Sequence, residues 1–133
     1  MISKEIDEYI REFTTPENEL MKDINRQTHL KTYYPNMLSG HIQGKFLEMI
    51  SRMIAPRRIL EVGTFTGYSA LAMAKGLAPD GKLITIDINE ELKEMIATFF
   101  RNSDHADKIE LHIGNALEII PHLDETFDLV FID

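Results

Sequence analysis

The sequence predicts an α/β protein in which helices wind around a parallel β-sheet. Two observations lead to this prediction. From residue 57 onward, short apolar runs alternate with helical patterns in units of roughly 25 residues, which is typical of strands joined by helices. Before residue 57, apolar residues recur at intervals of three and four, which indicates amphipathic helices. We therefore predict one domain over residues 1–133, with a helical extension at 1–56 and the sheet at 57–133.

The composition is that of a globular protein. Of the 133 residues, 44% are hydrophobic and 27% are charged, which is enough apolar surface for a core. The absence of cysteine rules out disulfides and thiolate metal ligands and fits a reducing compartment. A net charge of -8, with Lys and Arg scattered along the chain, disfavours a nucleic-acid-binding module. Because no apolar run of about 18 residues and no signal-peptide pattern occurs, we expect a cytoplasmic protein without a membrane partner.

Three helices are predicted in the amino-terminal part. The first covers residues 2–13, where apolar side chains form one stripe. The second is expected to start at residues 15–17, because Thr-Pro-Glu offers a cap, a proline for the first helical position and an acid for the first turn. This helix is expected to turn Leu20, Met21 and Ile24 inward.

Residues 33–40 predict an ordered loop, because they combine turn-forming residues with aromatic side chains. A third helix is expected at 41–54, and Pro56 ends it. Its apolar residues predict a wide buried face made of Ile42, Phe46, Leu47, Met49, Ile50 and Met53.

Strands and helices alternate after Pro56. Each predicted strand is a short apolar run, and each predicted helix carries apolar residues at helical spacing. Right-handed crossovers make the strands parallel. The predicted strands are 58–62, 82–87, 109–113 and 127–133, and the predicted helices are 67–76, 90–102 and 116–120.

The segment EVGTFTGYS at 61–69 joins the first strand to the helix after it. Gly63 and Gly67 allow the backbone to pass close to a ligand just before the helix begins. This pattern indicates a nucleotide-like ligand at the carboxyl end of the sheet, and a tight turn without a ligand is the alternative. The third glycine of the dinucleotide pattern and the GK[ST] ending of a phosphate loop are absent, which disfavours NAD, ATP and GTP.

Asp87 stands at the end of the second predicted strand. A carboxylate at this place can accept both hydroxyl hydrogens of a ribose. Alternatively, Asp87 caps the helix that begins at Glu90. Together with the glycine turn, the pattern favours ribose binding.

With these residues in place, the sequence resembles the catechol and caffeoyl-CoA O-methyltransferase family, including its bacterial members. The resemblance runs from about Met37 to the last residue and rests on three segments: 37–39 with Gly44, 61–69, and 127–133. It implies a Rossmann-like parallel sheet, the amino-terminal half of the class I methyltransferase fold, preceded by three helices. It also implies S-adenosylmethionine as the cofactor and a homodimer.

The resemblance further assigns roles to individual residues of the cofactor site. Ser39 and Glu61 would contact the amino acid part of the cofactor, and Asp87 would hold its ribose. Ala116 would lie against the adenine. The residues expected to line the pocket are Gly63, Thr64 and Ser69.

Asp133 corresponds to the first metal-binding aspartate of the family, and a carboxylate without a special role is the alternative. The lysine general base and the Asp-Asn pair of the family would follow beyond Asp133, so we assign no catalytic residue in this chain. One aspartate alone would bind magnesium poorly. The five histidines lack the spacing of a zinc site. The strand at 127–133 would be an apolar edge, which we expect further residues or another chain to cover.

The predicted function is methyl transfer from S-adenosylmethionine to a hydroxyl of a small catechol-like acceptor, with a divalent metal, magnesium. The chain would be inactive alone, because it would lack the metal and base residues that the family places after Asp133. The alternatives are a methyltransferase acting on hydroxyuridine in transfer RNA and a non-catalytic module for cofactor binding or oligomerisation. An NAD-dependent oxidoreductase is disfavoured by the missing third glycine.

Overall fold

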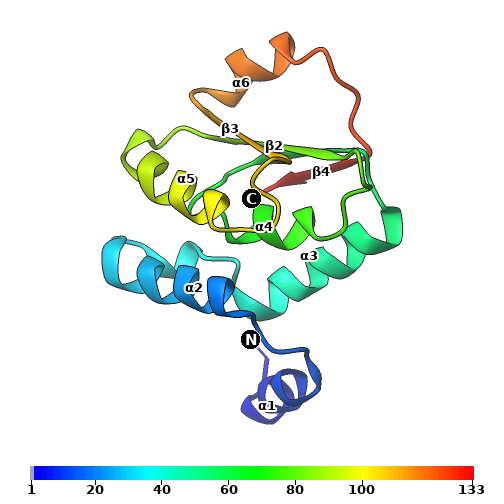
Figure 1. The fold of residues 1–133 in the computed structure, drawn as a ribbon. Helices are drawn as coiled ribbons and strands as arrows, with labels where there is room; N and C mark the ends of the chain where they lie inside the picture. The colour runs from blue at the N-terminus through cyan, green and yellow to red at the C-terminus, as the bar shows by residue number, and fades with distance from the viewer. Residues whose placement is uncertain (1) are drawn as a thin grey trace.

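The computed structural model describes residues 2–133 and contains a four-stranded parallel sheet with the strand order β3-β2-β1-β4 (Figure 1). The predicted α/β class and parallel sheet are confirmed. The strands are β1 (Arg58–Val62), β2 (Lys82–Asp87), β3 (Ile109–Ile113) and β4 (Leu129–Ile132). The α-helices are α1 (Lys4–Phe13), α2 (Glu19–Lys31), α3 (Gly40–Ile54), α4 (Tyr68–Ala74), α5 (Lys93–Arg101) and α6 (Ala116–Ile119). Short 3-10 helices are η1 (Pro35–Met37), η2 (Glu90–Leu92) and η3 (Ile120–His122).

Helices cover both faces of the sheet. Figure 1 shows α2, α3, α4 and α5 on one side of the strands and α6 on the other. The first side holds the larger core, in which α4 is buried along its whole length between the sheet and α3. The smaller core joins Leu60, Ile84 and Ile86 to apolar residues of α6 and the segment after it.

The register of β1 and β2 places Glu61 directly beside Thr85. On its other side β1 pairs with β4, so that Glu61 is in register with Phe131. Because β1 has a neighbour on each side, its carboxyl end lies in the middle of the sheet edge where ligands bind in open α/β folds.

The start of α2 differs from the prediction. The helix begins at Glu19 and not at residues 15–17, and its cap is Asn18, whose Oδ1 accepts a hydrogen bond of 2.9 Å from the Met21 N–H. Tertiary contacts explain the shift: the Tyr68 hydroxyl donates to Glu17, and the His41 ring contacts the Thr15 carbonyl at 2.7 Å. These contacts hold the segment before Asn18 outside the helix. The inward position predicted for Met21 is confirmed.

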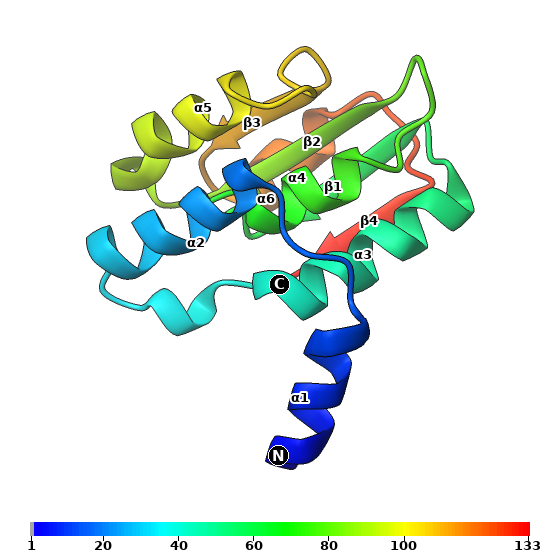
Figure 2. The same ribbon diagram turned by 60° about the horizontal axis from the view of Figure 1, so that its bottom comes forward.

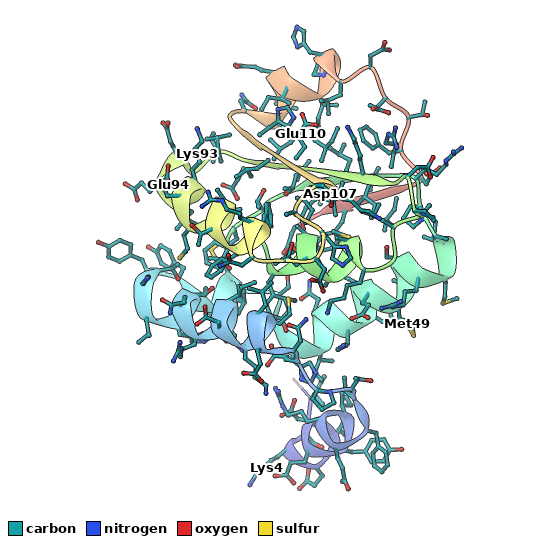
Figure 3. All side chains as sticks on the ribbon, in the orientation of Figure 1. Lys4, Met49, Lys93, Glu94, Asp107 and Glu110 are labelled. Carbon is teal, nitrogen blue, oxygen red and sulfur yellow. The ribbon has the colours of Figure 1, made fainter. Side chains whose placement is uncertain are left out.

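The predicted buried face of α3 is only partly correct. Leu47 is buried, but Phe46, Met49 and Met53 are exposed, Met53 to 79%. Met49 lies on the side of α3 that faces away from the sheet (Figure 3). The buried line of α3 consists of Gly44, Leu47 and Ser51.

Small residues let α3 approach α4 closely. A Cβ on Gly44 would lie 2.6 Å from the ring of Tyr68. Ser51 donates a hydrogen bond of 2.6 Å from its Oγ to the Met73 carbonyl. Because small side chains make this contact, the two helices pack closely along it.

Two apolar surfaces have no cover within residues 2–133. Helix α1 extends away from the rest of the molecule (Figure 2) and buries none of its residues. Strand β4 lies at the sheet edge, with Val130 and Ile132 exposed, as predicted for the strand at 127–133. In the part of the chain that the structure describes, no helix is long and apolar enough to cross a membrane.

Candidate functional site

The turn between β1 and α4 requires glycine at two positions. Gly63 has φ +104° and Gly67 has φ +87°, both in the left-handed region. A Cβ on Gly63 would lie 2.9 Å from the Asp133 carbonyl, and one on Gly67 would lie 2.6 Å from the Phe100 ring. The backbone at Gly63 and Gly67 therefore lies so close to Asp133 and Phe100 that a side chain at either position would clash.

Asp87 holds this turn in place. Its Oδ2 accepts a hydrogen bond of 2.7 Å from the backbone N–H of Phe65, a non-glycine residue with φ +48°. Its Oδ1 accepts a hydrogen bond of 2.8 Å from the Asn89 N–H. The helix cap itself is Asn89, whose Oδ1 accepts from the Glu91 N–H. Since each Asp87 oxygen accepts one of these hydrogen bonds, both keep a lone pair for a ligand hydroxyl.

A small pocket opens beside the turn, between η1, the start of α3 and the end of β4. It brings together five of the residues predicted for the site: Ser39, Gly63, Thr64, Ser69 and Asp133. Asp87, Ala116 and Glu61 are not among the residues that line it. The remaining lining residues are Met37, Leu38, Phe65, Thr66 and Tyr68.

Glu61 lies behind the pocket wall, with 0% of its surface exposed. Its Oε1 accepts a hydrogen bond from Ser69, which does line the pocket, and its Oε2 accepts one of 2.6 Å from Thr85. Burial raises the pKa of the Glu61 carboxyl to about 7; the hydrogen bonds from Ser69 and Thr85 oppose this rise, and the charges of Asp133 and Asp87 add to it. Glu61 therefore does not line the pocket itself, and its link to the pocket is the hydrogen bond from Ser69.

Buried threonines form two hydroxyl pairs near the turn; Thr64 was predicted as a site residue, whereas Thr28, Thr66 and Thr85 were not. The Oγ1 atoms of Thr64 and Thr85 are 2.6 Å apart. The Oγ1 atoms of Thr28, on α2, and Thr66, in the turn, are 2.9 Å apart. The available signal was a polar residue in the middle of an apolar strand, at position 85; the structure places it directly opposite Glu61.

Ala116 stands at the start of α6, near the carboxyl end of β3. The preceding Asn115 caps the helix by accepting a hydrogen bond of 3.0 Å from the Leu117 N–H. The Gly114 N–H donates to the Asp87 carbonyl at 2.8 Å. This contact ties the Ala116 segment to the strand that carries Asp87.

Comparison with known proteins identifies the family. A family model described as O-methyltransferase matches residues 11–133. The chain belongs to this O-methyltransferase family. It is 37% identical over 122 residues to caffeoyl-CoA O-methyltransferase 1 of Eucalyptus globulus, covering 88% of this chain and 49% of the relative. It is 38% identical over 100 residues to catechol O-methyltransferase of Mycobacterium tuberculosis, covering 74% and 46%.

Solved structures of O-methyltransferases share the fold. The O-methyltransferase TomG of Streptomyces achromogenes, in complex with SAM, matches with a TM-score of 0.89 and 35% identity over 100% of this chain and 63% of its own. An O-methyltransferase of Bacillus cereus, in complex with SAH, matches with a TM-score of 0.84 and 26% identity over 97% and 60%. This O-methyltransferase family member spans about half the length of the curated relatives it matches.

The described residues do not provide a complete metal site for this family member. Among residues 2–133, no group of three or more His, Asp or Glu side chains is placed to hold a metal ion. The Asp133 carboxylate accepts a hydrogen bond of 3.4 Å from the Ser39 hydroxyl. Because magnesium requires a near-octahedral oxygen shell, Asp133 alone does not fit the ion.

Proposed function

We propose that this chain binds S-adenosylmethionine at the glycine turn and that the whole protein transfers the methyl group to a hydroxyl oxygen. The observation that carries the proposal is the 2.7 Å hydrogen bond from the Phe65 N–H to Asp87, which joins the turn to a ribose-type carboxylate. Family membership supports it. Solved relatives with SAM and SAH bound support it as well.

The residues of the site suit different parts of this cofactor. We assign the ribose hydroxyls to Asp87, which has free lone pairs, and the amino acid part to Ser39 and the adjoining pocket wall. Glu61 would act on that part through Ser69. Ala116 would lie beside the adenine, because its segment is tied to Asp87. The pocket residues expected to surround the cofactor are Gly63, Thr64 and Ser69.

In this proposal the protein contributes binding and alignment. The cofactor supplies an activated methyl group, and the rate depends on how well the acceptor oxygen is held in line with it. Asp87 and the glycine turn would hold the cofactor, and so fix the position of its methyl group. We assign no catalytic residue among residues 2–133.

A small hydroxylated acceptor of the catechol type is the substrate class that we propose. Named relatives are a caffeoyl-CoA and a catechol O-methyltransferase. The net charge of -8 disfavours transfer RNA as the acceptor. We further propose that Asp133 supplies one ligand of a magnesium ion in the whole protein, and that the protein is a homodimer.

Calorimetric titration with S-adenosylhomocysteine tests cofactor binding. We expect the 133-residue chain to bind it, and the Asp87→Ala variant to lose about 10-fold or more in affinity, as expected for loss of a charged hydrogen-bond acceptor. Asp107→Ala, an exposed aspartate of the loop after α5 (Figure 3), is the matched control and should bind like the wild type. A folded wild-type chain that binds NAD instead, or neither ligand, would contradict the proposal.

A further inference from the structure

We propose that Thr85 is a positioning residue of the cofactor pocket. Thr85 holds the buried Glu61 carboxylate against Ser69, and it thereby sets the direction in which the Ser69 and Thr64 hydroxyls point. This inference rests on the proposed function. Thr85 itself does not line the pocket and is 0% exposed. Its effect on a ligand must therefore pass through the residues that it contacts.

The strand register creates this arrangement. Glu61 and Thr85 are direct neighbours in the parallel pair of β1 and β2. The Thr85 Oγ1 donates a hydrogen bond of 2.6 Å to the Glu61 Oε2, while Ser69 donates to the Glu61 Oε1. Both carboxylate oxygens thus have a partner, and the carboxylate is held from two sides.

The count of hydroxyl hydrogens gives the direction of each bond. Thr85 has one hydroxyl hydrogen, and it is donated to Glu61 when that carboxyl is ionised. In the 2.6 Å contact between Thr64 and Thr85, Thr64 must therefore be the donor. Since Ser69 also donates to Glu61, two hydroxyl hydrogens point to the carboxylate, and the Thr64 hydrogen points to the Thr85 oxygen.

The direction of these hydrogen bonds matters for ligand binding, because two of the three hydroxyls line the pocket. Thr64 and Ser69 both face the space proposed for the cofactor. With the Ser69 hydrogen turned to Glu61 and the Thr64 hydrogen turned to Thr85, both oxygens offer lone pairs to a ligand. If Thr85 lost its hydroxyl, the Glu61 Oε2 and the Thr64 hydroxyl would each lose a buried partner and would reorganise.

Nearby negative charges increase the need of the Glu61 carboxylate for hydrogen bonds from Ser69 and Thr85. The carboxylates of Asp87 and Asp133 act on Glu61, and both disfavour its ionised form. Its stabilising contacts are the hydroxyl groups of Ser69 and Thr85. The loss of one of only two such contacts should therefore displace the carboxylate from Ser69.

Two substitutions at position 85 separate positioning from packing. Thr85→Val keeps the shape of the side chain and removes the hydroxyl, whereas Thr85→Ser keeps the hydroxyl and removes a methyl group. We expect Thr85→Val to weaken S-adenosylhomocysteine binding about 10-fold, and Thr85→Ser to bind within about threefold of the wild type, even if its melting temperature falls. A residue that only packs would give the opposite order.

A measurement on the wild-type chain covers the case in which Thr85→Val does not fold. The γ-methyl resonance of Thr85, observed by NMR, should shift when S-adenosylhomocysteine is added, although Thr85 does not line the pocket. An unmoved resonance in a chain that binds the ligand, or unchanged binding by Thr85→Val, would overturn the positioning role alone. Failure of the wild-type chain to bind would overturn the proposed function instead.

Discussion

The Oδ2 of Asp128 accepts a hydrogen bond of 2.7 Å from the backbone N–H of Arg57, 71 residues earlier in the chain. The same oxygen accepts one of 3.0 Å from the Arg58 N–H. Asp128 directly precedes β4, and Arg58 begins β1. One carboxylate therefore fixes where β4 joins the sheet.

Removal of this carboxylate should loosen β4. We expect Asp128→Ala to lower the free energy of unfolding by about 1 kcal/mol, the contribution of a typical hydrogen bond, as measured by urea denaturation. Amide hydrogen exchange should rise most in residues 129–132. Asp124→Ala, an exposed aspartate of the same loop, is the control. Equal stability of the two variants would show that the Asp128 contacts contribute nothing.

Gly67 should tolerate no side chain. It combines φ +87° with a Cβ position 2.6 Å from the buried Phe100 ring. Gly40 has a similar φ of +75°, but nothing lies within 4 Å of its Cβ position. Gly67→Ala should therefore destabilise the protein by about 1 to 3 kcal/mol more than Gly40→Ala, because only the first adds overpacking to the backbone strain. Thermal melting of both variants checks this difference.

Stability should depend on pH through Glu61. Its folded pKa of about 7 lies above the reference value of 4.5, so the folded state binds the proton more tightly than the unfolded state. Its contribution is therefore fully present below pH 4.5 and is lost as the pH rises through about 7. The slope in this window should be at most about 1.4 kcal/mol per pH unit.

The Glu61→Gln variant should lack this slope, because glutamine does not titrate. Urea denaturation between pH 4.5 and 9 should show the wild type losing stability relative to Glu61→Gln, with the difference levelling off above about pH 8. Glu91→Gln, at an exposed glutamate, should give a curve parallel to the wild type. Parallel curves for Glu61→Gln as well would mean that Glu61 titrates normally.

Magnesium should not affect cofactor binding by this chain. Residues 2–133 contain no cluster that could hold a metal ion, and Asp133 offers one carboxylate. We expect the S-adenosylhomocysteine affinity to be the same within about twofold in magnesium and in EDTA, since a lone aspartate does not satisfy the ion. A tenfold tightening by magnesium would show that residues 2–133 bind the ion productively.

Helix α1 should take part in self-association. Tyr9 and Phe13 are exposed on it, with ring centroids 4.7 Å apart, and form an apolar surface together with Ile2 and Ile6. We expect sedimentation equilibrium to show a dimer that Tyr9→Glu weakens about 10-fold or more. Tyr33→Glu, at an exposed tyrosine outside the helices, should have no effect. A wild-type chain that is monomeric at high concentration would contradict the proposed homodimer.

Much of the fold could be predicted from local patterns. The alternation of apolar runs and helical spacing after residue 57 predicted the parallel sheet, because strands and helices repeat with different periods. The turn at 61–69 was visible because glycine is the residue that adopts positive φ readily. The grouping of Ser39, Thr64 and Ser69 around one pocket follows from the resemblance.

Other features depended on contacts between distant residues. The start of α2 moved to Glu19 because Glu17 and Thr15 bind residues of other helices. Helical periodicity shows that a face is apolar, but it does not show which neighbour covers it, and so the exposure of Phe46 and Met53 was not foreseen.

The sequence by itself determined the α/β class, the glycine turn and the acid at the end of β2, because each depends on residues close together in the chain. Only the tertiary structure decided that Glu61 lies behind Ser69 and that Thr85 holds it there. The physical reason is strand register: a shift of one residue between β1 and β2 would turn Thr85 to the opposite face of the sheet. The position of a buried hydroxyl therefore depends on pairing, which no local pattern specifies.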